Sequence, residues 1–89
     1  NLSFADLTHA DLNTADLTGA DLTNAVVKRS NLNTADLTSA NLSFADLTRA
    51  DLTDAKLTGA IWRETSCPNG TLNIGTEPCT GDQLIPMMI

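Results

Sequence analysis

The sequence predicts an all-β fold, a four-sided solenoid of about three coils that is closed by a C-terminal cap. Three observations predict it. A large apolar residue recurs every five residues from Leu2 to Leu57, and a small residue, nearly always Ala, recurs at the same interval. Longer stretches also repeat at offsets of 20 and 40 residues. Such a chain is expected to turn a corner every five residues and to return to the same side after four corners.

The five-residue units begin NLSFA, DLTHA, DLNTA, DLTGA and DLTNA. A period of five fits neither the 3.6 of a helix nor the 2.0 of a strand. We expect the apolar centre and the small fifth residue to point inward, because a narrow tube has room for one large side chain and one methyl group per side. The predicted core centres are Leu2, Leu7, Leu12, Leu17, Leu22, Val27, Leu32, Leu37, Leu42, Leu47, Leu52 and Leu57.

The longer repeats set the number of sides. NLSFADLTHA at 1–10 recurs as NLSFADLTRA at 41–50, and DLNTADLTGA at 11–20 recurs as NLNTADLTSA at 31–40. These offsets of 40 and 20 residues are both multiples of four pentads. Stacked positions therefore resemble one another if each coil contains four pentads.

The motif A(D/N)LTX, present at 5–8, 15–18, 35–38 and 45–48, resembles the pentapeptide-repeat family. The resemblance covers residues 1–60 and implies a right-handed quadrilateral parallel β-helix there. We predict that residues 61–89 form a cap and tail. Some long members of that family resemble B-form DNA and inhibit DNA gyrase by occupying its DNA-binding saddle. Three coils are far shorter than a useful mimic of a DNA duplex, so gyrase inhibition is the alternative function and not the first.

One pentad, VVKRS at 26–30, departs from the pattern. Val27 and Ser30 keep an apolar centre and a small inward residue, so the tube is expected to continue. The outward residues change to Val26, Lys28 and Arg29. This change is either drift on one face or a recognition spot.

The regular pattern stops after Ala60. Trp62 takes the place of a centre Leu, and we expect it to cover the open end of the tube, because a short solenoid needs capping. The segment that follows is rich in turn-forming residues. Leu72 and Ile74 alternate with polar neighbours and indicate a short strand, and the apolar tail at 84–89 is expected to pack back on the cap or, alternatively, to form a dimer contact.

Cys67 and Cys79 bracket the cap, with eleven residues between them. Structural zinc takes four ligands, and only His9, at the other end of the tube, could supply a nitrogen. We therefore favour a disulfide, which would contribute about 3 kcal/mol, over two reduced thiols. A disulfide favours the periplasm, the thylakoid lumen or another oxidising compartment over the cytoplasm.

The charge pattern argues against several functions. The formal net charge is −6, with the acids spaced singly, whereas direct nucleic-acid binding needs a basic footprint. No apolar run approaches the ~18 residues of a membrane span.

A tube filled with Leu and Ala offers no pocket, so we predict no catalytic residues, no cofactor and no metal site. Stacked aspartates such as Asp16 and Asp36 could in principle hold a cation, but bonding to turn amides is the more ordinary role. The pentad aspartates are Asp6, Asp11, Asp16, Asp21, Asp36, Asp46 and Asp51.

An outward column of His9, Arg29 and Arg49 is the least expected feature of an acidic chain. It is either an interaction surface or is neutralised locally, since Asp11 and Asp51 lie two residues beyond His9 and Arg49. We therefore predict a non-enzymatic structural or protein-interaction module with an unidentified protein partner. The chain itself is expected to be a monomer or a weak dimer.

Overall fold

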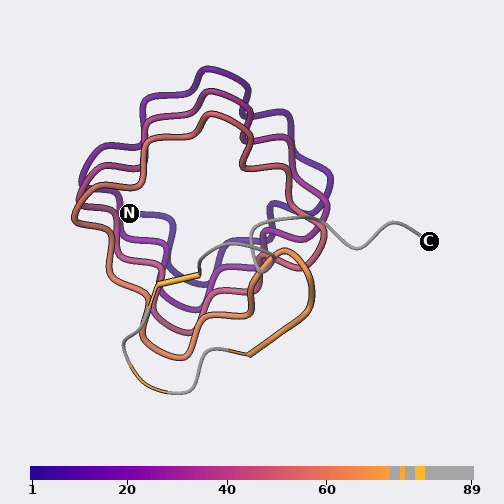
Figure 1. Cartoon of the computed structure of the whole chain (residues 1–89), viewed down its shortest axis with the longest axis vertical. Helices are drawn as coiled ribbons and strands as arrows, with labels where there is room; N and C mark the ends of the chain where they lie inside the picture. The colour runs from indigo at the N-terminus through magenta and orange to yellow at the C-terminus, as the bar shows by residue number, and fades with distance from the viewer. Residues whose placement is uncertain (73–74, 76–77, 80–89) are drawn as a thin grey trace.

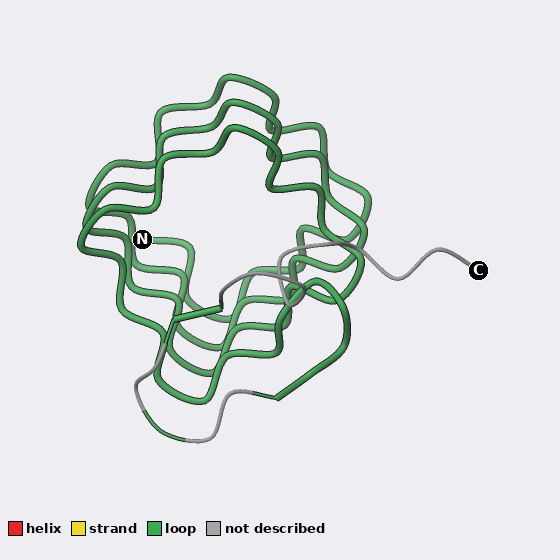
Figure 2. Ribbon diagram, in the orientation of Figure 1, coloured by secondary structure: helices red, strands yellow, loops and turns green. Residues whose placement is uncertain are grey.

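The computed structural model describes residues 1–72, 75 and 78–79. The chain winds as stacked coils, and parallel β-bridges pair each bridging residue with one twenty positions later, as in Asp16 with Asp36 and Asn41 with Ile61. Figure 1 looks along the stack and shows successive passes of the chain lying over one another around a common centre. Each pairing involves a single residue, so the described residues contain isolated bridges and no helix or longer strand, as Figure 2 shows.

Each pentad repeats one local structure. The first residue makes the bridge, the third and fourth form a turn, and the second and fifth point into the tube. The backbone bonds set the register: Leu37 N–H donates to Lys56 O at 2.8 Å and Ser39 N–H to Thr58 O at 2.9 Å. Asp36 N–H donates in the opposite direction, to Ala15 O at 2.9 Å. A pentad in the middle of the stack is thereby bonded to both neighbouring coils, and a pentad of the first coil to one.

The turn explains why Asp or Asn recurs at the first position. The side chain of Asp36 accepts the backbone N–H of Thr38 at 3.0 Å and its hydroxyl at 2.6 Å. A short side-chain acceptor can bond its own backbone two residues on, which stabilises a turn. The same backbone bond is made by Asn1, Asp6, Asp11, Asp16, Asp21, Asn31, Asn41, Asp46 and Asp51.

The fourth position of every pentad in residues 1–60 has a positive φ. The values run from 56° at Arg29 to 71° at Gly59. Most of these residues are not glycine, and two are the β-branched Thr14 and Thr34, for which this backbone region is costly. These residues adopt a positive φ because the turn at each corner requires that backbone conformation.

The core is complete in the middle of the stack. Leu32, Leu37 and Leu42 are at most 1% exposed. The predicted centres of the first coil, and Leu57 near the other end, are half-buried and pack against this core. The buried hydroxyls at the fifth position are satisfied: Ser30 donates to Val27 O at 2.9 Å and Thr65 to Leu42 O at 2.7 Å. The predicted inward set therefore points inward throughout, with its burial graded along the stack.

The coil continues beyond the predicted boundary at residue 60. Ile61 and Ser66 make the same parallel bridges as earlier first positions, with Asn41 and Asp46. Trp62 occupies an inward position and is 4% exposed, so it belongs to the buried core at this end of the tube. Its role in covering the open end stays a prediction. The division into units at 1–60 and 61–89 stays a prediction.

The cap begins where the direction of pairing reverses. Ser66 pairs with Leu72 in an antiparallel bridge, and Cys67 N–H donates to Thr71 O at 2.8 Å. Cys67 and Cys79 form a disulfide with Cα atoms 5.8 Å apart, and both side chains are buried. Ile74 and the apolar tail at 84–89 lie outside the described residues.

Candidate interaction surface

Outward residues twenty positions apart stand over one another in columns, because the bridges hold successive coils in register. The columns differ in chemistry. We name four of them by their members: the basic column (His9, Arg29, Arg49), the aromatic column (Phe4, Asn24, Phe44), the threonine column (Thr18, Thr38, Thr58) and the acidic column (Asp11, Asn31, Asp51).

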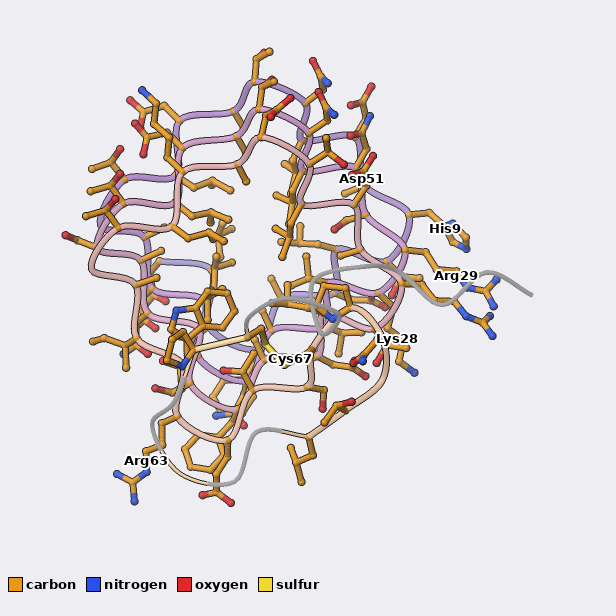
Figure 3. The ribbon with its side chains drawn as sticks, viewed as in Figure 1. His9, Lys28, Arg29, Asp51, Arg63 and Cys67 are labelled. Carbon is orange, nitrogen blue, oxygen red and sulfur yellow. A yellow bond between two sulfur atoms is a disulfide. The ribbon has the colours of Figure 1, made fainter. Side chains whose placement is uncertain are left out.

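The basic column occupies the fourth, turn position of three stacked pentads. His9, Arg29 and Arg49 have φ values of 62°, 56° and 63°, so they share one backbone conformation. Their N–H groups donate to the next coil, His9 to Lys28 O and Arg29 to Thr48 O at 2.9 Å each. Figure 3 shows His9 and Arg29 pointing away from the ribbon in the same direction. The structure thus brings the three predicted column residues together.

Lys28 lies beside this column but has an acidic neighbour. Its Nζ is 3.7 Å from Asp46 Oδ2, and both side chains are partly exposed. The pKa of Asp6 is lowered chiefly by the Thr8 hydroxyl and then by the Thr8 N–H, with the Lys28 charge as a smaller cause. Lys28 is therefore engaged with the first-position residues of its own pentad row.

The alternative of local neutralisation for the basic column finds no support in the described part of the chain. Neither Asp11 nor Asp51 forms an ion pair with His9 or Arg49 there, and the one ion pair found is that of Lys28 with Asp46. The Oδ1 atoms of Asp11 and Asp51 instead accept the backbone N–H groups of their own turns, at 3.1 Å and 2.9 Å. Arg49 Nε is covered and has no hydrogen-bond partner among the described residues.

The aromatic column exposes apolar surface. Phe4 is 75% exposed and Phe44 is 45% exposed. The guanidinium of Arg63 lies 5.8 Å from the centre of the Phe44 ring, a cation–π contact. Sequence reasoning missed Arg63 because it falls after the last regular pentad. Its distance of twenty residues from Ser43, the neighbour of Phe44, was the available signal.

The stacked carboxylates serve the turns. Hydroxyl bonds from Thr18 and Thr38, followed by the backbone N–H groups of the same residues, lower the pKa values of Asp16 and Asp36. The charge of Asp36 opposes this for Asp16, and the charge of Lys56 assists it for Asp36. Across the described residues, no group of three or more His, Cys, Asp or Glu side chains is placed to hold a metal ion.

No pocket is found in the structure over residues 1–72, 75 and 78–79. Within the same residues, there is no helix of the length and apolar character that crossing a membrane would require. The candidate surface is therefore the set of outward columns.

A family model described as pentapeptide repeats matches residues 1–38 and 15–54, with eight copies of the repeat. No curated protein matches the chain. A pentapeptide repeat protein from the thylakoid lumen of Arabidopsis thaliana is similar in structure, with a TM-score of 0.64 and 36% sequence identity over 65% of this chain and 40% of that one.

Two cyanobacterial structures from Nostoc match less well. HetL, a pentapeptide repeat protein involved in heterocyst differentiation regulation, has a TM-score of 0.42 and 28% identity over 76% of this chain and 43% of its own. A second Nostoc pentapeptide repeat protein has a TM-score of 0.32 and 32% identity over 65% of this chain and 60% of its own. In each case the match spans less than two thirds of the other protein.

Proposed function

The chain belongs to the pentapeptide-repeat family and has a right-handed β-helix fold, and from that premise we propose that it is a non-enzymatic module that presents its columns to a protein partner. The family consists in general of structural repeat proteins. The single observation that carries the proposal is the stacking of outward residues at an offset of twenty, which turns sequence differences between pentads into continuous strips of distinct chemistry.

We further propose that the coils form a quadrilateral tube. A turn every five residues and bridges twenty residues apart together imply four sides per coil. Each side is then a flat face that carries the outward columns of one row of pentads. Flat faces suit recognition of another protein, since protein interfaces rely on extended complementary surfaces and do not need a concave pocket.

The inward positions support a role without catalysis. Leu37, Ala40 and Leu47 are 0% exposed, so the interior is filled. Reactions need convergent polar groups in a concave site. The outward carboxylates are bonded to their own turns, as in Asp36 with Thr38.

We propose an oxidising compartment for the chain. The Cys67–Cys79 disulfide would persist there, and disulfides are rare in reducing compartments. The thylakoid lumen is one such place, and a similar pentapeptide repeat protein comes from it.

The experiment that tests the module uses the full-length natural gene product and variants altered on one face each. Phe44→Ser, Arg49→Gln and Lys56→Gln change different outward rows and leave the core intact. Cross-linking in an extract of the native compartment, followed by mass spectrometry, should identify a stoichiometric partner that one variant loses and the others keep. A partner captured equally by all three variants, or no partner at all, would contradict recognition through an outward face.

A further inference from the structure

We propose that the basic column of His9, Arg29 and Arg49 docks a carboxylate-rich segment of a protein partner. The inference rests on the proposed function and adds the chemistry of the partner to it. The inference is based on the stacked position of three side chains, on their charge and on their surroundings. The other named columns do not share these properties.

Within the described residues, none of the three side chains of the column forms an ion pair with an acidic neighbour. Arg29 and Arg49 sit at the same turn position of adjacent coils, which are spaced by about 4.8 Å along the stack. Like charges held directly opposite one another in neighbouring strands are unfavourable. An anion bound between the two guanidinium groups would relieve that repulsion.

The guanidinium groups favour carboxylates. Arg presents a planar set of donors that matches a carboxylate in a bidentate arrangement. Arg49 Nε is covered and without a partner in the described structure. A carboxylate would therefore be bound through the terminal nitrogens of Arg49 and would contact Arg29 in the adjacent coil.

The flanks of the column restrict the shape of the partner. Asp6 and Asp46 occupy the first position of the same row of pentads, and Asp11 and Asp51 occupy the first position of the next row. Their carboxylates are tied to turns and stay in place. A broad phosphate surface, such as a membrane or a nucleic acid, would meet these flanking acids, whereas a narrow segment fits between them.

The size of the column also argues against other occupants. Nucleic-acid binding draws its affinity from many phosphate contacts, and the column supplies two permanent charges and one imidazole. A second copy of this chain is the poorer fit because two turn corners would meet along a line. A stable protein interface buries about 800 Å² on each partner, far more than a row of three side chains.

The test is a nuclear magnetic resonance titration of the isotopically labelled chain with a short polyglutamate peptide at low salt. We expect saturable shifts of the Arg29 and Arg49 side-chain signals. The double variant Arg29→Glu/Arg49→Glu should bind at least about tenfold more weakly, because two exposed pairs are lost and two repulsions are added. Lys56→Glu/Arg63→Glu is the matched control, since it also reverses two positive charges but lies outside the basic column, and it should keep wild-type affinity.

A second variant, Arg29→Gln/Arg49→Gln, removes the charge at similar size and should show the same loss if the charge-reversed chain does not fold. Absence of polyglutamate binding, or equal binding by the charge-reversed and wild-type chains, would overturn the proposal. Tighter binding of phosphatidylserine vesicles or duplex DNA would assign the column to phosphates and overturn it too. Shifts in the column that depend on protein concentration without peptide would assign it to a second copy. The cross-linking experiment with the Phe44→Ser, Arg49→Gln and Lys56→Gln variants tests the proposed function separately.

Discussion

The middle and the ends of the stack contain the same pentad in different surroundings. AspLeuThr occurs at 16–18 in the first coil and at 36–38 in the second, yet Leu37 is 0% exposed while Leu17 is half-buried. Leu37 has a coil on both sides and Leu17 has one. The exposed fraction of a centre residue in a solenoid is therefore set by the neighbouring coils and not by the sequence of its own repeat.

At the C-terminal end, some centre residues are covered by a further coil and others are not. Leu42 and Leu47 are 0% exposed because the pentads at 61–65 and 66–70 continue the coil over them. Leu57 lies outside the two rows that residues 61–70 continue, and it is half-buried. The continued coil at 61–70 therefore buries the rows on which it stacks.

The largest expected effect comes from a charge in the middle of the stack. Leu37→Asp buries a carboxylate among apolar side chains, which costs several kcal/mol against a small total stability, so we expect loss of the folded state. Leu17→Asp makes the same change at a half-buried position and should be milder. Circular dichroism and thermal unfolding check this, and an unchanged melting temperature for Leu37→Asp would contradict its inward assignment.

Loss of the Cys67–Cys79 disulfide should destabilise the cap. Cys67→Ser/Cys79→Ser removes the cross-link over a loop that has little core of its own, and we expect a loss of about 3 kcal/mol in unfolding free energy. Denaturant unfolding measures it. Mass spectrometry without reductant should find the linked peptide in the native protein, and two thiols that alkylate freely in the folded chain would exclude both the bond and the oxidising compartment.

Acid should destabilise the stack. The Thr hydroxyl and N–H bonds lower the pKa values of Asp16, Asp21 and Asp36 in the folded state below those of the unfolded chain. Their stabilisation is therefore fully present above the unfolded pKa of about 4 and is lost as pH falls through the lowered folded values. The melting temperature should be flat between about pH 5 and 7 and fall below about pH 4. A melting temperature that rises on acidification would reverse the sign of this argument.

A smaller effect separates two residues of the threonine column. The Thr38 hydroxyl bonds Asp36 at 2.6 Å, whereas Thr58 follows Lys56 and has no carboxylate in its own pentad. Thr38→Ala should lower the unfolding free energy and weaken the dependence on acid. Thr58→Ala, the control, should change neither by as much; equal effects of the two would show that the carboxylate bond contributes nothing.

The smallest expected effect is no effect at all. We predict that the chain does not inhibit DNA gyrase supercoiling at micromolar concentration, because three coils span only about 14 Å and the basic column interrupts the acidic surface. Arg49→Glu should not create inhibition, since height is limiting. Strong, salt-sensitive inhibition in a supercoiling assay would contradict the interaction-module proposal, and inhibition only by a longer natural chain would assign that activity to additional coils.

The repeat made much of the architecture predictable. The period of five marks every inward residue, because only the second and fifth positions are consistently apolar or small. The recurrence of 1–10 at 41–50 carries the coil offset, and the bridges have that same offset. The basic column followed from the same arithmetic, since residues twenty apart had to stack if the register held.

Where the repeat becomes irregular, the sequence pattern does not predict whether the coil continues or which side chains meet. The coil passes through Ile61 and Ser66 because backbone bonds to the preceding coil accept any side chain at those positions. The Lys28–Asp46 pair and the Arg63–Phe44 contact depend on side chains from successive coils meeting across the stack. Periodicity alone predicts which residues point inward and which residues stack, because both depend only on the spacing of the repeat. The depth of burial and the choice of partner for each exposed charge were decided by the coils above and below, because these properties depend on neighbours in space.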